Sequence, residues 1–174
     1  MLPRDDLVHV LRRCLPQIVE DLPVQLAYLH GSVARGEQTP VSDVDIALVC
    51  DEGISSRDRL QLMLHVSAEL SAQAGIAEAD VRVINAAPLV FRGRVACEGI
   101  LLYARDDVQR IEFETRTRDE YFDFLPFHRR LQDAFLENVR EQGILYGRVE
   151  TGHVARRNTA RARAAASLLL MGPA

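Results

Sequence analysis

The sequence predicts an α/β fold in which strands and helices alternate along the chain. Short apolar runs typical of buried strands alternate with longer stretches in which apolar residues recur every three or four positions, as on a helix face. Segments rich in turn-forming residues separate the two patterns. With 174 residues, of which 48% are hydrophobic, the chain is long enough for one compact domain with a substantial core.

The first 32 residues predict a helix followed by a strand. The apolar stripe of the helix consists of Leu7, Leu11, Cys14 and Ile18. Pro16 lies inside that stripe and lacks the N–H that a helix interior uses, so we expect the helix to end or kink there. Residues 24–30 read as a short buried strand, which stops at the Gly31-Ser32 pair.

A loop and two further strands are predicted on either side of a long helix. Residues 33–42 are small, polar or turn-forming and indicate the loop, and residues 43–50 resume as a strand. A helix then runs from Ser55 or Ser56 to about residue 74, with Gly75 as its stop. Its expected buried face is Leu60, Met63, Val66 and Leu70. Residues 80–85 predict the third strand.

The second half of the chain is mostly helical. A short helix is expected from about Pro88, a fourth strand over residues 100–103, and helices over residues 106–146 that are split at Pro126. The apolar face after the split is Leu131, Phe135 and Val139. Four of the ten aromatic residues fall between positions 121 and 127, and they either pack in the core or form a partner-binding face. These four are Tyr121, Phe122, Phe124 and Phe127.

Charge and composition exclude several classes of protein. All 21 basic residues are arginine, and the absence of lysine excludes a P-loop and any Schiff-base mechanism. The net charge of -4 makes nucleic-acid binding by the whole protein unexpected. Residues 148–174 differ, with five arginines and one acid, and read as a basic, flexible tail behind a domain of residues 1–147.

The remaining composition indicates a cytoplasmic protein without a membrane span. Cys14, Cys50 and Cys97 are odd in number and widely spaced, which favours reduced thiols over disulfides or a zinc site. No signal-peptide pattern follows Met1. No apolar run approaches the roughly 20 residues that a membrane span needs.

The segment around Gly31 has the features of a phosphate-binding corner. Gly31 has no Cβ, so a phosphate can approach the backbone closely at the end of the strand. Ser32 adds a hydroxyl donor, and the N–H groups of a following turn would face the same anion. Arg35 supplies a permanent, planar cation to phosphate oxygens. We therefore expect Gly31, Ser32 and Arg35 to bind a nucleotide.

Acidic residues downstream predict a metal site. Asp43 and Asp45 lie two positions apart, about 6–7 Å along a strand, so their carboxylates point to one face. Such a pair beside an apolar core favours a cation, and Mg²⁺ suits oxygen ligands and substrate phosphates. Two ions would hold both the attacking and the leaving oxygen at phosphorus. Asp80 is the best candidate for a third ligand, with Glu78 as the second choice.

The two aspartates also fit other kinds of motif. Ser42-Asp43 alone fits a turn or cap. An EF-hand loop starting at Asp43 fails, because Leu48 stands where that loop needs glycine. An Asp-x-Asp motif of the kind found in sugar-nucleotide transferases stays open from the two aspartates alone. The Gly31-Ser32 step upstream is what favours a nucleotide and metal site.

Taken together, the sequence resembles the DNA polymerase β-type nucleotidyltransferases, whose signature is Gly-Ser, ten residues, then Asp-x-Asp. Gly31-Ser32, residues 33–42 and Asp43-Val44-Asp45 fit that spacing without a gap. More narrowly, the chain resembles the minimal nucleotidyltransferases, the MntA-like antitoxins of type VII HEPN/MNT toxin–antitoxin pairs. The supporting blocks are LHGSVARG, SDVDIALV, DVRVINAAP, EGILLYARD and EYFDFLPFHRR. His30 departs from the pattern, because an apolar residue commonly precedes the Gly-Ser.

The resemblance implies a mixed sheet with flanking helices, comprising a core of about 24–104 and C-terminal helices of about 105–146. It also implies Mg²⁺-dependent transfer of AMP from ATP to a tyrosine of a cognate HEPN RNase toxin, within a hetero-oligomeric complex. Gly31 and Ser32 would then hold the nucleotide phosphates. Asp43, Asp45 and Asp80 would be catalytic metal ligands, with Asp80 also a candidate base for the acceptor hydroxyl.

Two alternative functions remain open from the sequence. The first is transfer of a nucleotide to a small molecule such as an aminoglycoside, for which only the helices of residues 105–146 could complete a second pocket. The second is a non-catalytic protein that neutralises a toxin by binding it through the aromatic segment 121–127. RNA binding by the arginine-rich tail is a weaker third possibility.

Overall fold

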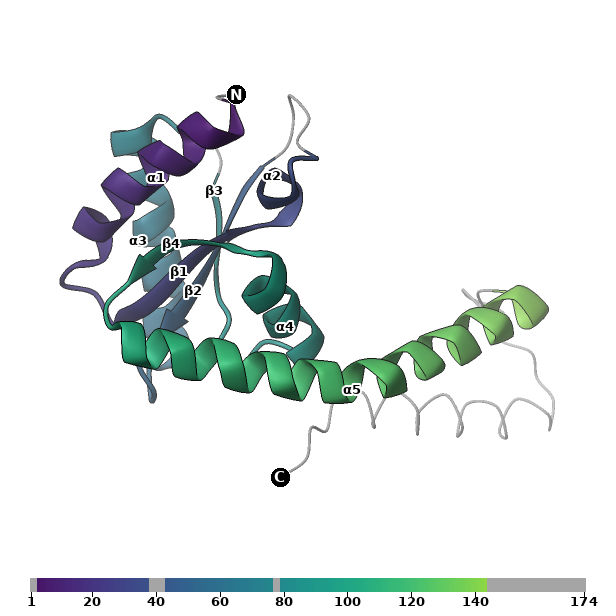
Figure 1. Ribbon diagram of the computed structural model, residues 1–174. Coiled ribbons are helices and arrows are strands. Elements are labelled where there is room, and N and C mark those ends of the chain that lie inside the picture. Colours follow the sequence, from purple (N-terminus) through teal and green to yellow (C-terminus); the bar gives the residue numbers. More distant parts are fainter. Residues whose placement is uncertain (1–2, 38–42, 77–78, 144–174) are drawn as a thin grey trace. The chain divides into compact units, whose positions relative to one another are not determined.

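A four-stranded mixed sheet with helices on both faces organises the fold (Figure 1). The structure is a computed structural model that describes residues 3–37, 43–76 and 79–143. The chain divides after Arg129 into two compact units, Met1–Arg129 and Arg130–Ala174. The first unit contains the whole sheet and the predicted site.

The strand order is β3-β2-β1-β4. The two central strands are therefore β1, which ends just before Gly31, and β2, which contains Asp45. Strand β2 pairs in parallel with β3 and antiparallel with β1, and β1 pairs antiparallel with β4. The strands are β1 (Val24–His30), β2 (Val44–Cys50), β3 (Ala79–Val83) and β4 (Ile100–Ala104). This topology confirms the predicted fold class, a mixed sheet flanked by helices.

The helices form two layers, with α1 and α3 on one face of the sheet and α4 and the start of α5 on the other (Figure 1). The predicted boundaries of α3 are confirmed: the Ser55 hydroxyl accepts the N–H of Asp58, and Gly75 ends the helix in the left-handed conformation. The helices are α1 (Arg4–Val19), α2 (Gly31–Arg35), α3 (Ser56–Ala74), α4 (Leu89–Glu98) and α5 (Asp107–Gln142).

Alternation along the strands sends two different sets of side chains to the two faces. Val44, Ile46 and Leu48 pack into the core beneath α1 and α3. The intervening positions of the sheet pack against α4 and α5, through Leu26, Tyr28, Ala47, Val49 and Ile84. Because side chains alternate with a period of two, positions 30, 45 and 80 also belong to the α4 side.

Neither α1 nor α5 ends at its internal proline, where the sequence predicted an end or a kink in α1 and a split in α5. Helix α1 runs through Pro16 to Val19, and α5 runs through Pro126 as one helix rather than two. A proline removes one backbone hydrogen bond, but the turns on either side can hold the helix together. In α1 the residues after Pro16 are held by burial of Ile18 and Val19.

The apolar face of α3 also differs from the prediction. Leu60 is 53% exposed, whereas Leu62, Val66 and Leu70 are buried. A spacing of four residues carries Leu62, Val66 and Leu70 along the same side of the helix, and this side faces the sheet. Met63 packs at the edge of the same core.

The aromatic segment of α5 is divided between packing and exposure. Tyr121 packs against Gly93 of α4, where a Cβ on the glycine would come within 2.2 Å of the tyrosine ring. Phe122 and Phe127 are exposed. The segment is therefore not simply core. The arginine-rich tail of residues 148–174 lies outside the described residues. None of the described helices combines the length and apolar character needed to cross a bilayer.

Candidate active site

Three polar side chains form a row across the sheet on its α4 side. In the pairing register, His30 of β1 lies opposite Asp45 of β2, and Asp45 lies opposite Asp80 of β3. Neighbouring strands are about 4.8 Å apart, and residues in register point to the same face. The structure therefore brings together Asp45 and Asp80, which are 35 positions apart in the sequence.

Gly31 forms a tight corner directly against Asp45. A Cβ built on Gly31 would lie 2.1 Å from Oδ2 of Asp45, and the backbone of Gly31 has a φ of +76°. Any other residue would both collide with the carboxylate and adopt a left-handed conformation that disfavours side chains. The glycine is required here because the carboxylate occupies the space that a side chain would need.

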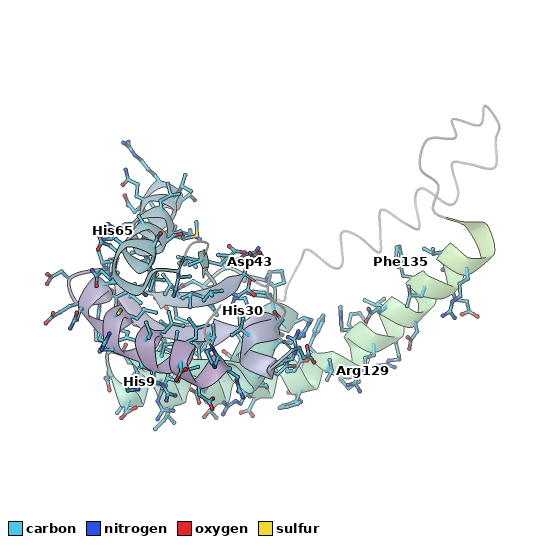
Figure 2. All side chains as sticks on the ribbon, turned by 90° about the horizontal axis from the view of Figure 1, so that it is seen from above. His9, His30, Asp43, His65, Arg129 and Phe135 are labelled. Carbon is cyan, nitrogen blue, oxygen red and sulfur yellow. The ribbon has the colours of Figure 1, made fainter. Side chains whose placement is uncertain are left out.

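Asp43 lies at the same end of the sheet as this corner. Strand β2 begins at Val44, so Asp43 precedes the strand rather than opening it as predicted, and its side chain is exposed. Figure 2 shows His30 and Asp43 at one end of the sheet, with His9 and His65 away from them. Glu78, the second choice for a third ligand, lies outside the described residues.

The carboxylate of Asp80 is bonded to Arg82. Both Nε and Nη2 of Arg82 donate to Oδ2 of Asp80, the first at 2.9 Å. Arg82 was not among the predicted site residues. A signal was present, because residues i and i+2 of a strand share a face and an arginine two positions after an aspartate can turn back onto it. The hydrogen bonds that Arg82 donates to Asp80, followed by the negative charge of that carboxylate, raise the pKa of the Arg82 guanidinium above its ordinary value.

His30 contributes a half-buried imidazole beside these charges. Its ring packs edge-on against Phe91 of α4, with the ring centres 5.3 Å apart, and its Nε2 is buried without a hydrogen-bond partner among the described residues. Burial lowers the pKa of His30 from its ordinary value, while the neighbouring Asp45 acts in the opposite direction. The row therefore presents two carboxylates and a histidine that favours its neutral form.

Ser32 and Arg35 lie in α2, immediately after the Gly31 corner. Ser32 is half-buried. Arg35 donates from Nε to Glu37 at 2.8 Å, and its Nη1 lies 3.9 Å from Glu98. The hydrogen bond to Glu37 raises the pKa of Arg35. The predicted phosphate ligand is thus exposed and paired with acidic side chains that an anionic ligand would have to replace.

A second polar network supports the sheet one row further from the corner. The buried hydroxyl of Tyr28 donates to Glu114 of α5 at 3.0 Å, and Glu114 also pairs with Arg110 at 3.5 Å and Arg118 at 3.3 Å. Burial, followed by the charge of Glu114, raises the pKa of Tyr28 well above its ordinary value. This network connects α5 to β1, the strand that ends at His30, directly before Gly31.

The chemistry and location of the predicted ligand side chains fit a divalent cation, but their oxygens do not converge on a common position. Asp43, Asp45 and Asp80 offer the oxygen ligands that Mg²⁺ prefers, at one end of two adjacent strands. Within residues 3–37, 43–76 and 79–143, no three acidic, histidine or cysteine side chains converge as a metal site. Asp80 is instead bonded to Arg82. The assignment of Asp43, Asp45 and Asp80 as ligands therefore stays a prediction.

A glycine corner beside carboxylates on neighbouring strands is the arrangement that the sequence predicted for a nucleotidyltransferase. Residues 15–108 match the family described as Polymerase beta, Nucleotidyltransferase. This match spans more than half of the chain and includes β1, β2, β3 and β4. The chain belongs to the polymerase β nucleotidyltransferase family.

Several solved structures with a similar fold come from toxin–antitoxin complexes. A toxin–antitoxin structure with AMP-PNP matches with a TM-score of 0.58 and 22% identity, over 72% of this chain and 98% of the other. The MNT antitoxin in complex with a tri-AMPylated HEPN toxin of Shewanella oneidensis matches with a TM-score of 0.56 and 18% identity, over 74% and 98%. Among curated proteins, none matches in sequence. The resemblance to MntA-like antitoxins is confirmed by fold.

Proposed function

We propose that this protein is an antitoxin that transfers AMP from ATP to a tyrosine of a cognate HEPN RNase toxin and so neutralises it. Membership of a nucleotidyltransferase family supports the transfer of a nucleotide. The structures of similar fold supply the rest: one antitoxin complex contains AMP-PNP, and another contains a tri-AMPylated HEPN toxin. The partner is accordingly a HEPN toxin held in a hetero-oligomeric complex.

The single observation that carries the proposal is the contact between Gly31 and Asp45. The carboxylate fills the place of a side chain at the corner, so the backbone that would receive phosphates lies directly beside a carboxylate oxygen that could bind the metal ion. A phosphate and its metal ion must be close neighbours in a nucleotidyl transfer. A glycine that merely ended a strand would not need this contact.

The remaining residues divide between the nucleotide and the metal. Gly31, Ser32 and Arg35 bind the triphosphate, with Arg35 exchanging Glu37 and Glu98 for phosphate oxygens. Asp43, Asp45 and Asp80 would hold two Mg²⁺ ions. When bound, these ions supply positive charge to the α-phosphate and the departing pyrophosphate.

The reaction is an in-line displacement in which atoms and charges balance. The tyrosine oxygen forms a bond to the α-phosphorus while the bond from that phosphorus to the bridging oxygen of pyrophosphate breaks. The hydroxyl proton passes to a base, for which Asp80 is placed on the strand beside Asp45. The chain's own contribution is to position the two substrates and to compensate developing charge.

The test compares two aspartates at opposite ends of β2. The full-length protein is incubated with ATP, Mg²⁺ and the product of the neighbouring reading frame, and the partner's intact mass is measured. Wild type and Asp51→Asn should add AMP, whereas Asp45→Asn should lose at least about 100-fold in rate, as expected when a metal ligand is removed. Both aspartates are half-buried, which makes Asp51→Asn a matched control for general damage.

The alternative functions give different results in the same experiment. AMP addition to an aminoglycoside but not to the partner would assign the small-molecule reaction. Neutralisation of the toxin by Asp45→Asn as well as by wild type, without AMP on either protein, would assign sequestration. Equal transfer by Asp45→Asn and wild type would overturn the metal site itself.

A further inference from the structure

Arg82 stands out because it is bonded to Asp80, a carboxylate that the proposed site needs. Two of its nitrogens, Nε and Nη2, converge on the same atom, Oδ2 of Asp80, rather than spreading over both oxygens of the carboxylate. An oxygen that accepts two charged hydrogen bonds is not free to bind a metal ion. Metal binding through that oxygen therefore requires Arg82 to move.

The position of Arg82 is explained by the charges around it. Asp45 and Asp80 lie side by side on parallel strands, and like charges at this spacing repel. The guanidinium of Arg82 interacts electrostatically with both carboxylates. The other nearby arginine, Arg35, is already paired with Glu37. Arg82 thus serves as the positive charge of the site when no cation is bound.

The ion pair is exposed enough to exchange readily. The Arg82 side chain is 59% exposed and that of Asp80 is 39% exposed. Exposed ion pairs are weak and their long side chains rearrange without disturbing the core.

We propose that Arg82 is a built-in counter-ion that a divalent cation must displace from Asp80, so that the site binds metal weakly alone and more strongly together with a triphosphate. This inference rests on the proposed function. A released guanidinium remains beside the site, where it repels a bare divalent cation. Next to a nucleoside triphosphate that carries one divalent cation, whose net charge is negative, the same guanidinium is favourable.

The experiment measures binding of Mn²⁺ to the full chain by the loss of the free-ion signal in electron paramagnetic resonance. Arg82→Gln should bind Mn²⁺ about three- to tenfold more tightly than wild type, because an exposed competing pair and a like charge are both removed. In the presence of AMP-PNP the difference between the two proteins should fall below about twofold.

A matched control removes an arginine from a similar pair at the other end of the sheet. Arg105 pairs with Asp51 at 3.3 Å, and the side chains are 39% and 42% exposed. Arg105→Gln changes the net charge by the same amount as Arg82→Gln but should leave the Mn²⁺ affinity unchanged. Thermal unfolding of all three proteins confirms that each is folded.

The outcomes separate this inference from the proposed function. Equal or weaker Mn²⁺ binding by Arg82→Gln overturns the counter-ion role, and the proposed function stands if Asp45→Asn abolishes that binding. Tighter binding by Arg105→Gln as well would show a general charge effect and would also overturn the role. If neither wild type nor Arg82→Gln binds Mn²⁺, both the role and the metal site are wrong.

Discussion

The two ends of β2 each have an aspartate near an arginine, but the charged groups around the two aspartates differ. Beyond the last residue of the strand, Asp51 accepts a hydrogen bond from Gln25 at 3.0 Å and pairs with Arg105 at 3.3 Å. Near the first residue, Asp45 lies beside a second carboxylate, Asp80, whose arginine is Arg82. At the end of β2, the Asp51 carboxylate is paired with the Arg105 cation and the Gln25 amide. Near the start of β2, two carboxylates lie side by side, and one of them is paired with Arg82.

The glycines near the two ends of β2 also differ. Gly31 and Gly53 both have left-handed backbones, with φ of +76° and +82°. A Cβ on Gly53 would meet nothing within 4 Å, whereas one on Gly31 would collide with Asp45. A cavity of about 500 Å³ adjoins Gly53 and Asp51. Both ends of β2 have an acidic residue, and the cavity adjoins the end at Asp51. The candidate active site is distinguished instead by the close contact between a glycine backbone and a carboxylate.

The largest expected effect comes from breaking the crowded corner with Gly31→Ala. The new Cβ must push the Asp45 carboxylate away, so AMP transfer should fall by about 100-fold or more, as when a reacting group is misplaced by about 1 Å. The left-handed backbone adds about 1–2 kcal/mol of destabilisation. Both effects are measured, by transfer rate and by chemical denaturation.

Gly53→Ala is the matched control for that variant. It carries the same backbone cost without a collision, so it should lose about 1–2 kcal/mol of stability and keep wild-type transfer. Equal loss of transfer in both variants would show that general destabilisation, and not displacement of Asp45, explains the effect.

A smaller effect is expected in the middle of the sheet, where the Tyr28 hydroxyl donates to Glu114 of α5. Its pKa is raised from 10.0 in the folded protein, so its contribution to stability is complete below pH 10 and is lost as the pH rises further. The wild type should lose about 1.4 kcal/mol per pH unit above about pH 10 from this group. Burial also raises the pKa of Cys50 to about 12, so stability is also lost through Cys50 over the same range, and the difference between wild type and a Tyr28 variant is what reports on Tyr28.

Tyr28→Phe tests this dependence. At pH 7 the variant should be about 1 kcal/mol less stable, because the hydrogen bond to Glu114 is lost. Its denaturation midpoint should fall less steeply than that of wild type between pH 10 and 11.5. Parallel curves for the two proteins would contradict the raised pKa.

The smallest effect concerns Arg35, which is exposed and paired with Glu37. Arg35→Gln should raise the KM for ATP about two- to fivefold and leave kcat nearly unchanged, because an exposed charge contributes similarly to substrate and transition state. Steady-state kinetics at varied ATP check the split. A fall in kcat with an unaltered KM would place Arg35 at the transferred phosphate instead.

Much of this architecture was predictable because local patterns determine it. The alternation of Val44, Ile46 and Leu48 indicated a strand with one buried face, and Ser55 and Gly75 correctly bounded α3. The two prolines were misleading, since a helix can continue past a missing hydrogen bond when its neighbouring turns hold. Leu60 was misassigned because several faces of a helix can satisfy a loose apolar spacing.

The sequence by itself determined the fold class, the family and the choice of Gly31, Asp43, Asp45 and Asp80 as candidates, because strand periodicity and motif spacing are local properties. Only the tertiary structure decided which of them are neighbours. The parallel pairing of β2 with β3 sets Asp45 beside Asp80, and the turn after β1 presses Gly31 against Asp45. The bonding of Arg82 to Asp80 likewise depends on how a long side chain folds back over a charged sheet edge, which spacing alone does not specify.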